Sequence, residues 1–208
     1  MTARATRTRR RTRIQEENEE KILAASLDVF SDKGFRGASL DDIATAAGMS
    51  KPNMLYYFRG KEEIYLTLLS RLLEDWLTPL KTLDPAGDPL EEVGAFIRLK
   101  LKMAREFPRE SRLFANEIIR GAPHIGDHLH GPLKDLVDEQ CKVLQAWIDA
   151  GKIAQVSPHH LIFTIWATTQ HYADFDAQVG AVLAERDATR FEDAEATLMT
   201  LILGGLKV

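Results

Sequence analysis

Three polar side chains stand where two short helices are expected to begin, at positions that suit contact with phosphate. Ser39 precedes one apolar segment, and Ser50 and Lys51 open the next. Backbone N–H groups at a helix N-terminus, together with side chains of these types, bind phosphate oxygens. Further along, the amide of Asn53 can pair bidentately with an adenine edge, and Met54 can contact a thymine methyl group. These residue types predict binding to both the backbone and the bases of DNA.

The other reactive residues do not form a catalytic or metal-binding pattern. The sequence has no Gly-rich phosphate loop, no G-x-S-x-G elbow and no H-E-x-x-H motif. His124, His128 and His130 lie among proline and glycine residues, with no nearby cysteine to complete a zinc site. The single cysteine, Cys141, falls in the middle of an expected helix and is interpreted as a small buried hydrophobe. We therefore expect no enzymatic activity, no metal and no cofactor.

The elements that must position these residues are almost all helices, because apolar residues recur at helical spacing and strand patterns are nearly absent. The expected helices cover roughly residues 18–32, 40–47, 51–57, 61–80, 89–106, 109–120, 133–150, 157–178 and 188–203. Ser39 and Asp42 match a capping box for the second of these helices. The sequence predicts an all-α fold of about nine helices.

Two short helices joined by Gly48-Met49-Ser50 are typical of a helix-turn-helix, whose second helix offers its N-terminal residues to the major groove. Residues 1–61 hold 12 basic and 8 acidic residues, whereas residues 62–208 hold 15 and 23. A basic head on an acidic body indicates a DNA-binding head. Six arginines fall within residues 1–13, and this arm is expected to track phosphates or enter a minor groove. The alternative is a solvated tail.

Segment 39–61, SLDDIATAAGMSKPNMLYYFRGK, resembles the DNA-binding signature of the tetracycline-repressor (TetR) family of bacterial regulators. The resemblance implies that Tyr56, Tyr57 and Lys61 contact phosphates, with core packing as the alternative for both tyrosines. Leu55 departs from the aromatic residue of many members, so no contact is assigned to it. The implied organisation is a flexible basic arm (1–16), a helix-turn-helix domain (17–60) and a ligand-binding and dimerisation domain (61–208). A homodimer on a two-fold symmetric double-stranded DNA operator follows from this resemblance.

Five segments of the body resemble the pyrimidine-sensing regulators of this family: WLTPLK (76–81), FIRLKLK (96–102), SRLF (111–114), GAP (121–123) and HLIFTIWATTQHYADFDAQV (160–179). The resemblance implies a repressor of pyrimidine-catabolism and nitrogen-metabolism genes that uracil or thymine releases from DNA. A uracil ring has carbonyl acceptors and N–H donors, so its site needs aromatic faces and an amide or hydroxyl. Trp166 and Gln170 lie four residues apart on one helix face and are the first candidates. The residues expected to close the site are Trp76, Phe114, Asn116 and Tyr172.

One alternative keeps the DNA-binding head and changes the ligand: a TetR-type regulator of efflux or lipid genes that senses a larger apolar compound. In that case Trp76 and Phe114 are ordinary core residues and Asn116 is a surface residue. The volume of the pocket distinguishes the two functions.

The location is expected to be cytoplasmic, at the nucleoid. No run of eighteen apolar residues is present, and no apolar segment follows the charged N-terminus. A single cysteine also suits a reducing compartment.

Overall fold

The computed structural model describes residues 13–208, apart from the side chains at 185 and 186. Five of the six arm arginines precede residue 13, so the expected basic arm lies almost entirely outside the described residues. Within the described part every regular element is a helix, which confirms the all-α prediction. No helix of this part is both long and apolar enough to cross a membrane.

The chain divides into two compact units, with unit 1 ending at Leu68 and unit 2 spanning Leu69–Val208. The division falls inside α4 (Lys61–Lys81), whereas the sequence placed the domain boundary before the first residue of that helix. Because α4 is one continuous helix, no turn or linker in the sequence marks the change from one core to the other.

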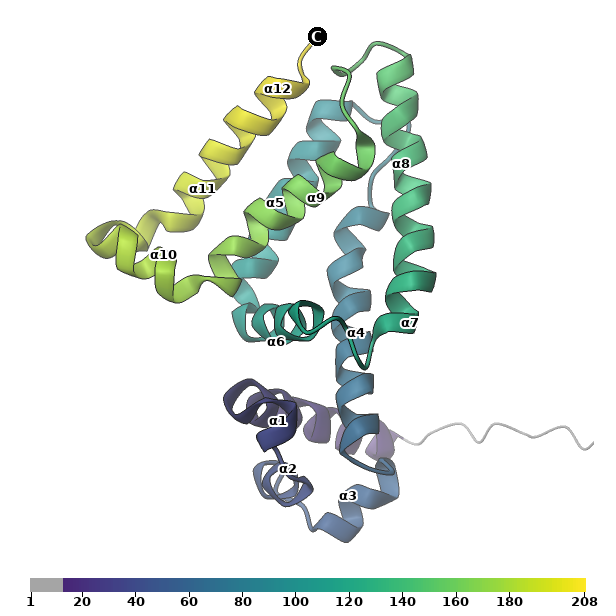
Figure 1. Ribbon diagram of the computed structural model, residues 1–208, viewed down its shortest axis with the longest axis vertical. Coiled ribbons are helices and arrows are strands. Elements are labelled where there is room, and N and C mark those ends of the chain that lie inside the picture. Colours follow the sequence, from purple (N-terminus) through teal and green to yellow (C-terminus); the bar gives the residue numbers. More distant parts are fainter. Residues whose placement is uncertain (1–12) are drawn as a thin grey trace, which may run out of the picture. The chain divides into compact units, whose positions relative to one another are not determined.

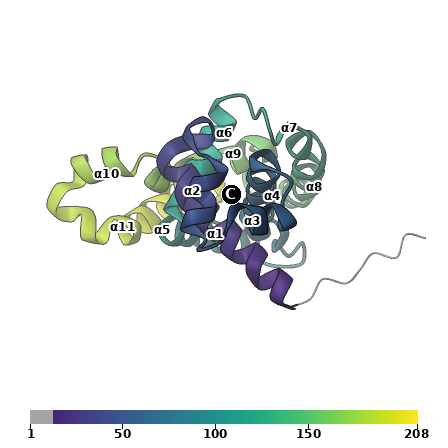
Figure 2. The ribbon, with the colours of Figure 1, turned by 90° about the horizontal axis from the view of Figure 1, so that it is seen from below.

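Unit 1 is built from α1 (Arg13–Gly37), α2 (Leu40–Ala46), α3 (Lys51–Tyr57) and the start of α4, which lie together in Figure 2. Its core is apolar: Ile22, Phe30, Ile43 and Met54 are each at most 1% exposed. Helix α1 starts earlier than residue 18, where the sequence placed its beginning. It leaves the helical conformation at Gly34, at φ 67° and ψ 169°, where the sequence placed its C-terminal cap.

The turn between α2 and α3 has the geometry of a helix-turn-helix. Gly48 adopts a φ of 64°, a left-handed conformation that favours glycine, and Met49 N donates to Ala44 O at 2.9 Å. The capping box predicted for α2 is present, since the Ser39 hydroxyl accepts from Asp42 N and the Asp42 carboxylate accepts from Ser39 N. Local capping therefore defines both helices of the motif.

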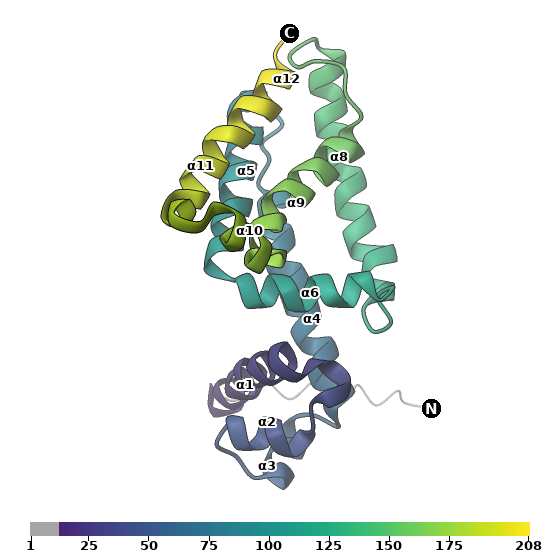
Figure 3. The same cartoon turned by 60° about the vertical axis from the view of Figure 1, so that its left-hand side comes forward.

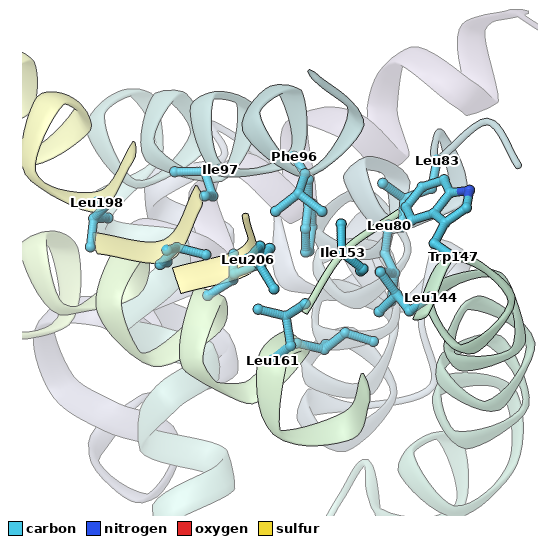
Figure 4. Close-up of a cluster of buried hydrophobic side chains, with 14 of the residues drawn as sticks. Leu80, Leu83, Phe96, Ile97, Leu144, Trp147, Ile153, Leu161, Leu198 and Leu206 are labelled. Carbon is cyan, nitrogen blue, oxygen red and sulfur yellow. The ribbon is translucent and has the colours of Figure 1, made fainter. Parts of the chain in front are cut away.

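Unit 2 contains the remaining helices (Figure 1). They are α5 (Pro89–Glu106), α6 (Pro108–Ile119), α7 (Gly126–His128), η1 (Leu129–Leu133), α8 (Lys134–Asp149), α9 (Pro158–Asp174), α10 (Asp176–Leu183), η2 (Ala184–Thr189), α11 (Arg190–Leu198), η3 (Met199–Leu203) and α12 (Gly204–Leu206). Helix α9 packs against α5, α6 and α8, and α11 packs against α5. The core lies among them, and Figure 4 shows Leu80, Phe96, Leu144, Leu161 and Leu198 among its side chains.

Helix α9 ends earlier than the sequence predicts. The expected helix over 157–178 breaks at Phe175, where φ is −114° and ψ is 31°, and α10 then runs in a new direction (Figure 3). Two contacts from α6 hold this end: Ser111 Oγ donates to Asp174 Oδ1 at 2.5 Å, and Arg112 donates to Ala173 O at 3.1 Å. These residues are about 60 positions away in sequence, which explains why local periodicity did not reveal the break.

Three threonines of α9 turn their hydroxyl groups back onto their own helix. Thr164 donates to His160 O and Thr168 to Thr164 O, each at 2.7 Å, and Thr169 donates to Ile165 O at 2.6 Å. Thr169 is buried, while Thr164 is exposed. The hydroxyl groups are thus satisfied without any partner outside the helix.

Candidate functional site

The exposed side of α3 carries three of the expected DNA contacts. Lys51, Asn53 and Tyr56 are exposed, and Tyr56 keeps 70% of its surface accessible. Asn53 and Tyr56 are three residues apart and share a helix face, while Lys51 lies in the first turn. A short helix with an amide, a phenol and an ammonium group on its open side can present them to base edges and phosphates in a major groove.

Met54 does not belong to that open side. Its side chain has no exposed surface, so the expected contact with a thymine methyl group is wrong: Met54 is a core residue of unit 1. Phe58, four residues further on, is also buried, as the sequence indicated. Leu55 is 41% exposed and is an apolar side chain on the open side of α3.

Ser39 and Ser50 are the N-caps of α2 and α3, as predicted. The Ser50 hydroxyl accepts from Asn53 N at 3.4 Å, so both hydroxyls serve the caps of their helices. Lys51 Nζ lies 2.9 Å from Asp41 Oδ2, which places an acid of α2 beside the first cation of α3. Their contacts with phosphate stay predictions.

Tyr56 and Tyr57 connect the end of α3 to the start of α1. The Tyr57 hydroxyl accepts from Asn18 Nδ2 at 2.8 Å, and the Tyr56 hydroxyl accepts from Gln15 Nε2 at 3.3 Å. Their rings meet edge to face with centroids 5.2 Å apart. Tyr57 is half-buried, so of the two tyrosines Tyr56 is the more open to phosphate.

Lys61 has a structural role that the sequence did not reveal. Its ammonium donates to Phe35 O and Ala38 O, both at 2.8 Å, and lies 4.6 Å from the centre of the Phe35 ring. These bonds occupy two of its three donors and fix the end of α1 to the start of α4. One donor is left for the predicted phosphate contact.

Unit 2 encloses a polar cluster that sequence reasoning missed. Trp76 of α4 is 6% exposed, and Lys100 of α5, 2% exposed, holds its ammonium 4.3 Å from the centre of the Trp76 ring. Burial lowers the pKa of Lys100 to about 7, against the opposing charge of Asp174 at the end of α9. Burial in turn raises the pKa of Asp174, although the bond from Ser111 opposes this. The signal in the sequence was a lysine in register with the buried Phe96, Ile97 and Ala104 of α5.

The expected ligand residues are only partly brought together. Trp166 is half-buried against the core of unit 2, and Gln170 is half-buried on the same stripe of α9. Phe114 of α6 is half-buried. Asn116 is exposed and therefore does not close a buried site, which corrects that expectation.

Tyr172 points away from Gln170, because two residues along a helix correspond to roughly opposite sides. Its ring lies 6.0 Å from that of Phe191 and lines an open recess of about 440 Å³ between α9, α10 and α11. The expectation that Tyr172 joins Trp166 and Gln170 around one ligand is wrong.

The histidines of 124–130 do not gather a metal-binding set. His124 Nδ1 lies 3.2 Å from the buried Glu117 carboxylate, which also accepts from His124 N at 2.7 Å. His128 Nε2 lies 3.3 Å from Ser70 Oγ. Within the described residues no three His, Cys, Asp or Glu side chains are grouped for a metal ion.

Comparisons with known proteins match both units. The profile described as "Bacterial regulatory proteins, tetR family" matches residues 22–68, and that described as "YcdC-like protein, C-terminal region" matches residues 69–208. The HTH-type transcriptional regulator RutR of Escherichia coli K12 is 44% identical over 202 residues, covering 96% of this chain and 95% of RutR. The chain belongs to the TetR family.

Solved structures of other TetR-like regulators share the fold of this TetR-family chain. A putative regulator of Streptomyces coelicolor, SCO4942, aligns with a TM-score of 0.69 at 22% identity, covering 91% of this chain and 98% of that one. A TetR-like regulator from Rhodococcus sp. RHA1 aligns with a TM-score of 0.67 at 20% identity, covering 95% and 98%. Both matches support the fold alone.

As a TetR-family member, the chain is a ligand-responsive, DNA-binding transcriptional regulator and not an enzyme. Regulators of this family bind DNA operators and small-molecule effectors and are typically dimers. The family assignment gives unit 1, with the open side of α3, the place of the DNA-binding head. The second profile covers unit 2, with its buried polar cluster.

Proposed function

We propose that this protein is a homodimeric repressor of pyrimidine-catabolism and nitrogen-metabolism genes, which uracil or thymine releases from a two-fold symmetric operator. The observation that carries the proposal is the near full-length match to RutR, at 44% identity, which extends through unit 2. Unit 2 also contains the five segments that resemble pyrimidine-sensing regulators. Such a protein acts in the cytoplasm, at the nucleoid.

The side chains of unit 2 suit a small polar ring. Trp166, Gln170 and Asp174 follow one another at four-residue spacing and form a stripe along α9. An indole offers a ring face, and the amide of Gln170 donates and accepts towards the edge of a pyrimidine. Within residues 13–208 the Gln170 amide has no hydrogen-bond partner, so it is available to a ligand. A large apolar ligand gains nothing from these polar groups, which cost free energy when buried without partners.

The test is a calorimetric titration of the full chain with uracil and thymine, beside a long-chain fatty acid as the probe for a larger apolar ligand. We expect both pyrimidines to bind and to release DNA selected from a random pool by the protein itself. Binding of the fatty acid, with no response to either pyrimidine, would replace the proposal by the efflux or lipid alternative.

Gln170→Leu is the matching variant. It leaves polar atoms of the pyrimidine unpaired, and a lost hydrogen bond of this kind costs about 1–3 kcal/mol, so we expect uracil affinity to fall about tenfold to a hundredfold. Gln145→Leu on α8 is the control, because Gln145 bonds Asp149 on an exposed helix face. Unchanged uracil affinity in Gln170→Leu would show that the site lies elsewhere in unit 2.

A further inference from the structure

Lys100 is an unusual polar residue of unit 2, because its side chain is almost fully buried although it ends in an ionisable amine. The residue is 2% exposed and projects from α5 towards Trp76 of α4. No residue of the described chain accepts a hydrogen bond from its ammonium, and none lies at ion-pair distance. A buried ammonium needs such partners, since its desolvation is costly.

The Trp76 ring satisfies only part of this need. A cation above an indole face is stabilised, but the ammonium has three N–H donors and the ring occupies one direction. Asp174 acts on Lys100 by its charge, yet its carboxylate is engaged by Ser111 Oγ at 2.5 Å. At least one donor of Lys100 is thus free for an acceptor that the protein itself does not supply.

Helices α5 and α9 pack against each other, so Lys100 and Gln170 lie on neighbouring helices of unit 2. Asp174, which acts on Lys100, lies one helical turn beyond Gln170, a separation of about 6 Å along the axis. A ligand at Gln170 therefore lies about one helical turn from Asp174, the carboxylate whose charge acts on Lys100.

We propose that the Lys100 ammonium donates a hydrogen bond to a carbonyl oxygen of the effector, while Gln170 pairs with another edge of the same ring. This inference rests on the pyrimidine function proposed above and deepens it. The inference implies an effector that carries a strong acceptor oxygen on an aromatic ring. Lys100 thereby distinguishes oxo-pyrimidines from apolar rings of the same size.

The first test compares Lys100→Met with Lys102→Met, a change of the same type at an exposed position of the same helix. Methionine keeps the approximate length of lysine and removes the charge. We expect uracil affinity to fall about tenfold to a hundredfold in Lys100→Met and to stay unchanged in Lys102→Met. Replacing a buried, unpaired charge by an apolar group also leaves the melting temperature equal or higher. A lower melting temperature with unchanged uracil affinity would mean that Lys100 serves the fold alone and would overturn the inference.

The second test removes the acceptor instead of the donor. 2-Pyrimidinone and 4-pyrimidinone each lack one of the two carbonyl oxygens of uracil. For one of the two analogues, we expect the affinity for wild type to be as low as the affinity of uracil for Lys100→Met. The affinity of that analogue for Lys100→Met should then be no lower than its affinity for wild type. Additive losses for both analogues would overturn the inference and leave the pyrimidine function standing. A wild-type protein that binds neither uracil nor thymine would overturn both.

A third test measures proton uptake on uracil binding, which a lysine with a purely structural role would not change. A carbonyl oxygen beside Lys100 raises its pKa above the value of about 7 in the free protein, so binding at pH 7.5 takes up protons. The charged groups to control are Asp174 itself, and Arg112 and His171, which act on Asp174. Calorimetry in buffers of different ionisation enthalpy should show uptake for wild type and none for Lys100→Met. Equal uptake in both proteins would contradict the inference.

Discussion

Asp41 places a negative charge beside the cation that opens the recognition helix. Its carboxylate is 70% exposed and lies 2.9 Å from Lys51 Nζ, which is itself 43% exposed. An exposed ion pair contributes little to stability, with typical values of about 0–1 kcal/mol. The pair matters more for DNA binding, because the Asp41 carboxylate competes with phosphate for the Lys51 ammonium and repels the DNA backbone.

Asp41→Asn should therefore strengthen binding to operator DNA. We expect a rise of about twofold to fivefold at low salt, and a plot of log affinity against log salt that steepens by about 0.9 if Lys51 gains one phosphate. Fluorescence anisotropy over a salt series measures both quantities, with Asp32→Asn on α1 as the control. An unchanged affinity and slope would mean that Lys51 does not face a phosphate.

Five residues show what the sequence could and could not predict at this scale. Ser39, Ser50 and Lys51 were placed correctly at helix starts, because capping depends on near neighbours. Met54 and Lys100 were not, since their burial depends on helices far away in sequence. A lysine is expected at the surface, so the sequence pattern does not predict its place among the buried positions of α5.

Helix α2 depends on a cap whose charge can be titrated. The hydrogen bond from Lys33, and then those from Ser39, lower the pKa of the Asp42 carboxyl to about 2. A group whose pKa is lowered on folding stabilises the folded state above its unfolded pKa of about 4, and this contribution is lost as the pH falls towards 2.

Asp42→Asn should consequently lower the melting temperature near pH 7, and the difference from wild type should shrink as the pH falls from about 4 to 2. Thermal unfolding followed by circular dichroism at several pH values measures the difference. Asp127→Asn, an exposed acid of α7, is the control. A difference that stays constant between pH 7 and pH 3 would contradict the assigned role of the Asp42 charge.

The elements themselves follow from local sequence wherever their boundaries are local. Gly48 and the two capping serines define α2 and α3, and Pro89 and Pro108 lie in the first turns of α5 and α6. The end of α9 at Asp174 depends on Ser111 and Arg112, so periodicity extended the helix too far.

At the scale of the whole molecule, the proposed function gives the protein two binding activities that must be linked. If uracil weakens operator binding by some factor, operator DNA must weaken uracil binding by the same factor, because the coupling free energy is shared. We expect this factor to be about 5-fold to 150-fold.

Titrations of uracil with and without saturating operator, and of operator with and without uracil, measure the coupling from both sides. Equal factors support release of DNA by the effector. A uracil affinity that is the same for free and DNA-bound protein would separate effector binding from regulation.

The threonines of α9 change what a hydropathy scale says about that helix. Thr164 and Thr168 give their hydroxyl protons to carbonyls one turn back, so outwards they present methyl groups much as valine would. Together with the half-exposed Phe163, they make the surface of α9 more apolar than its residue types suggest. A partner helix laid there would need no hydrogen-bond donors or acceptors of its own to satisfy these threonines.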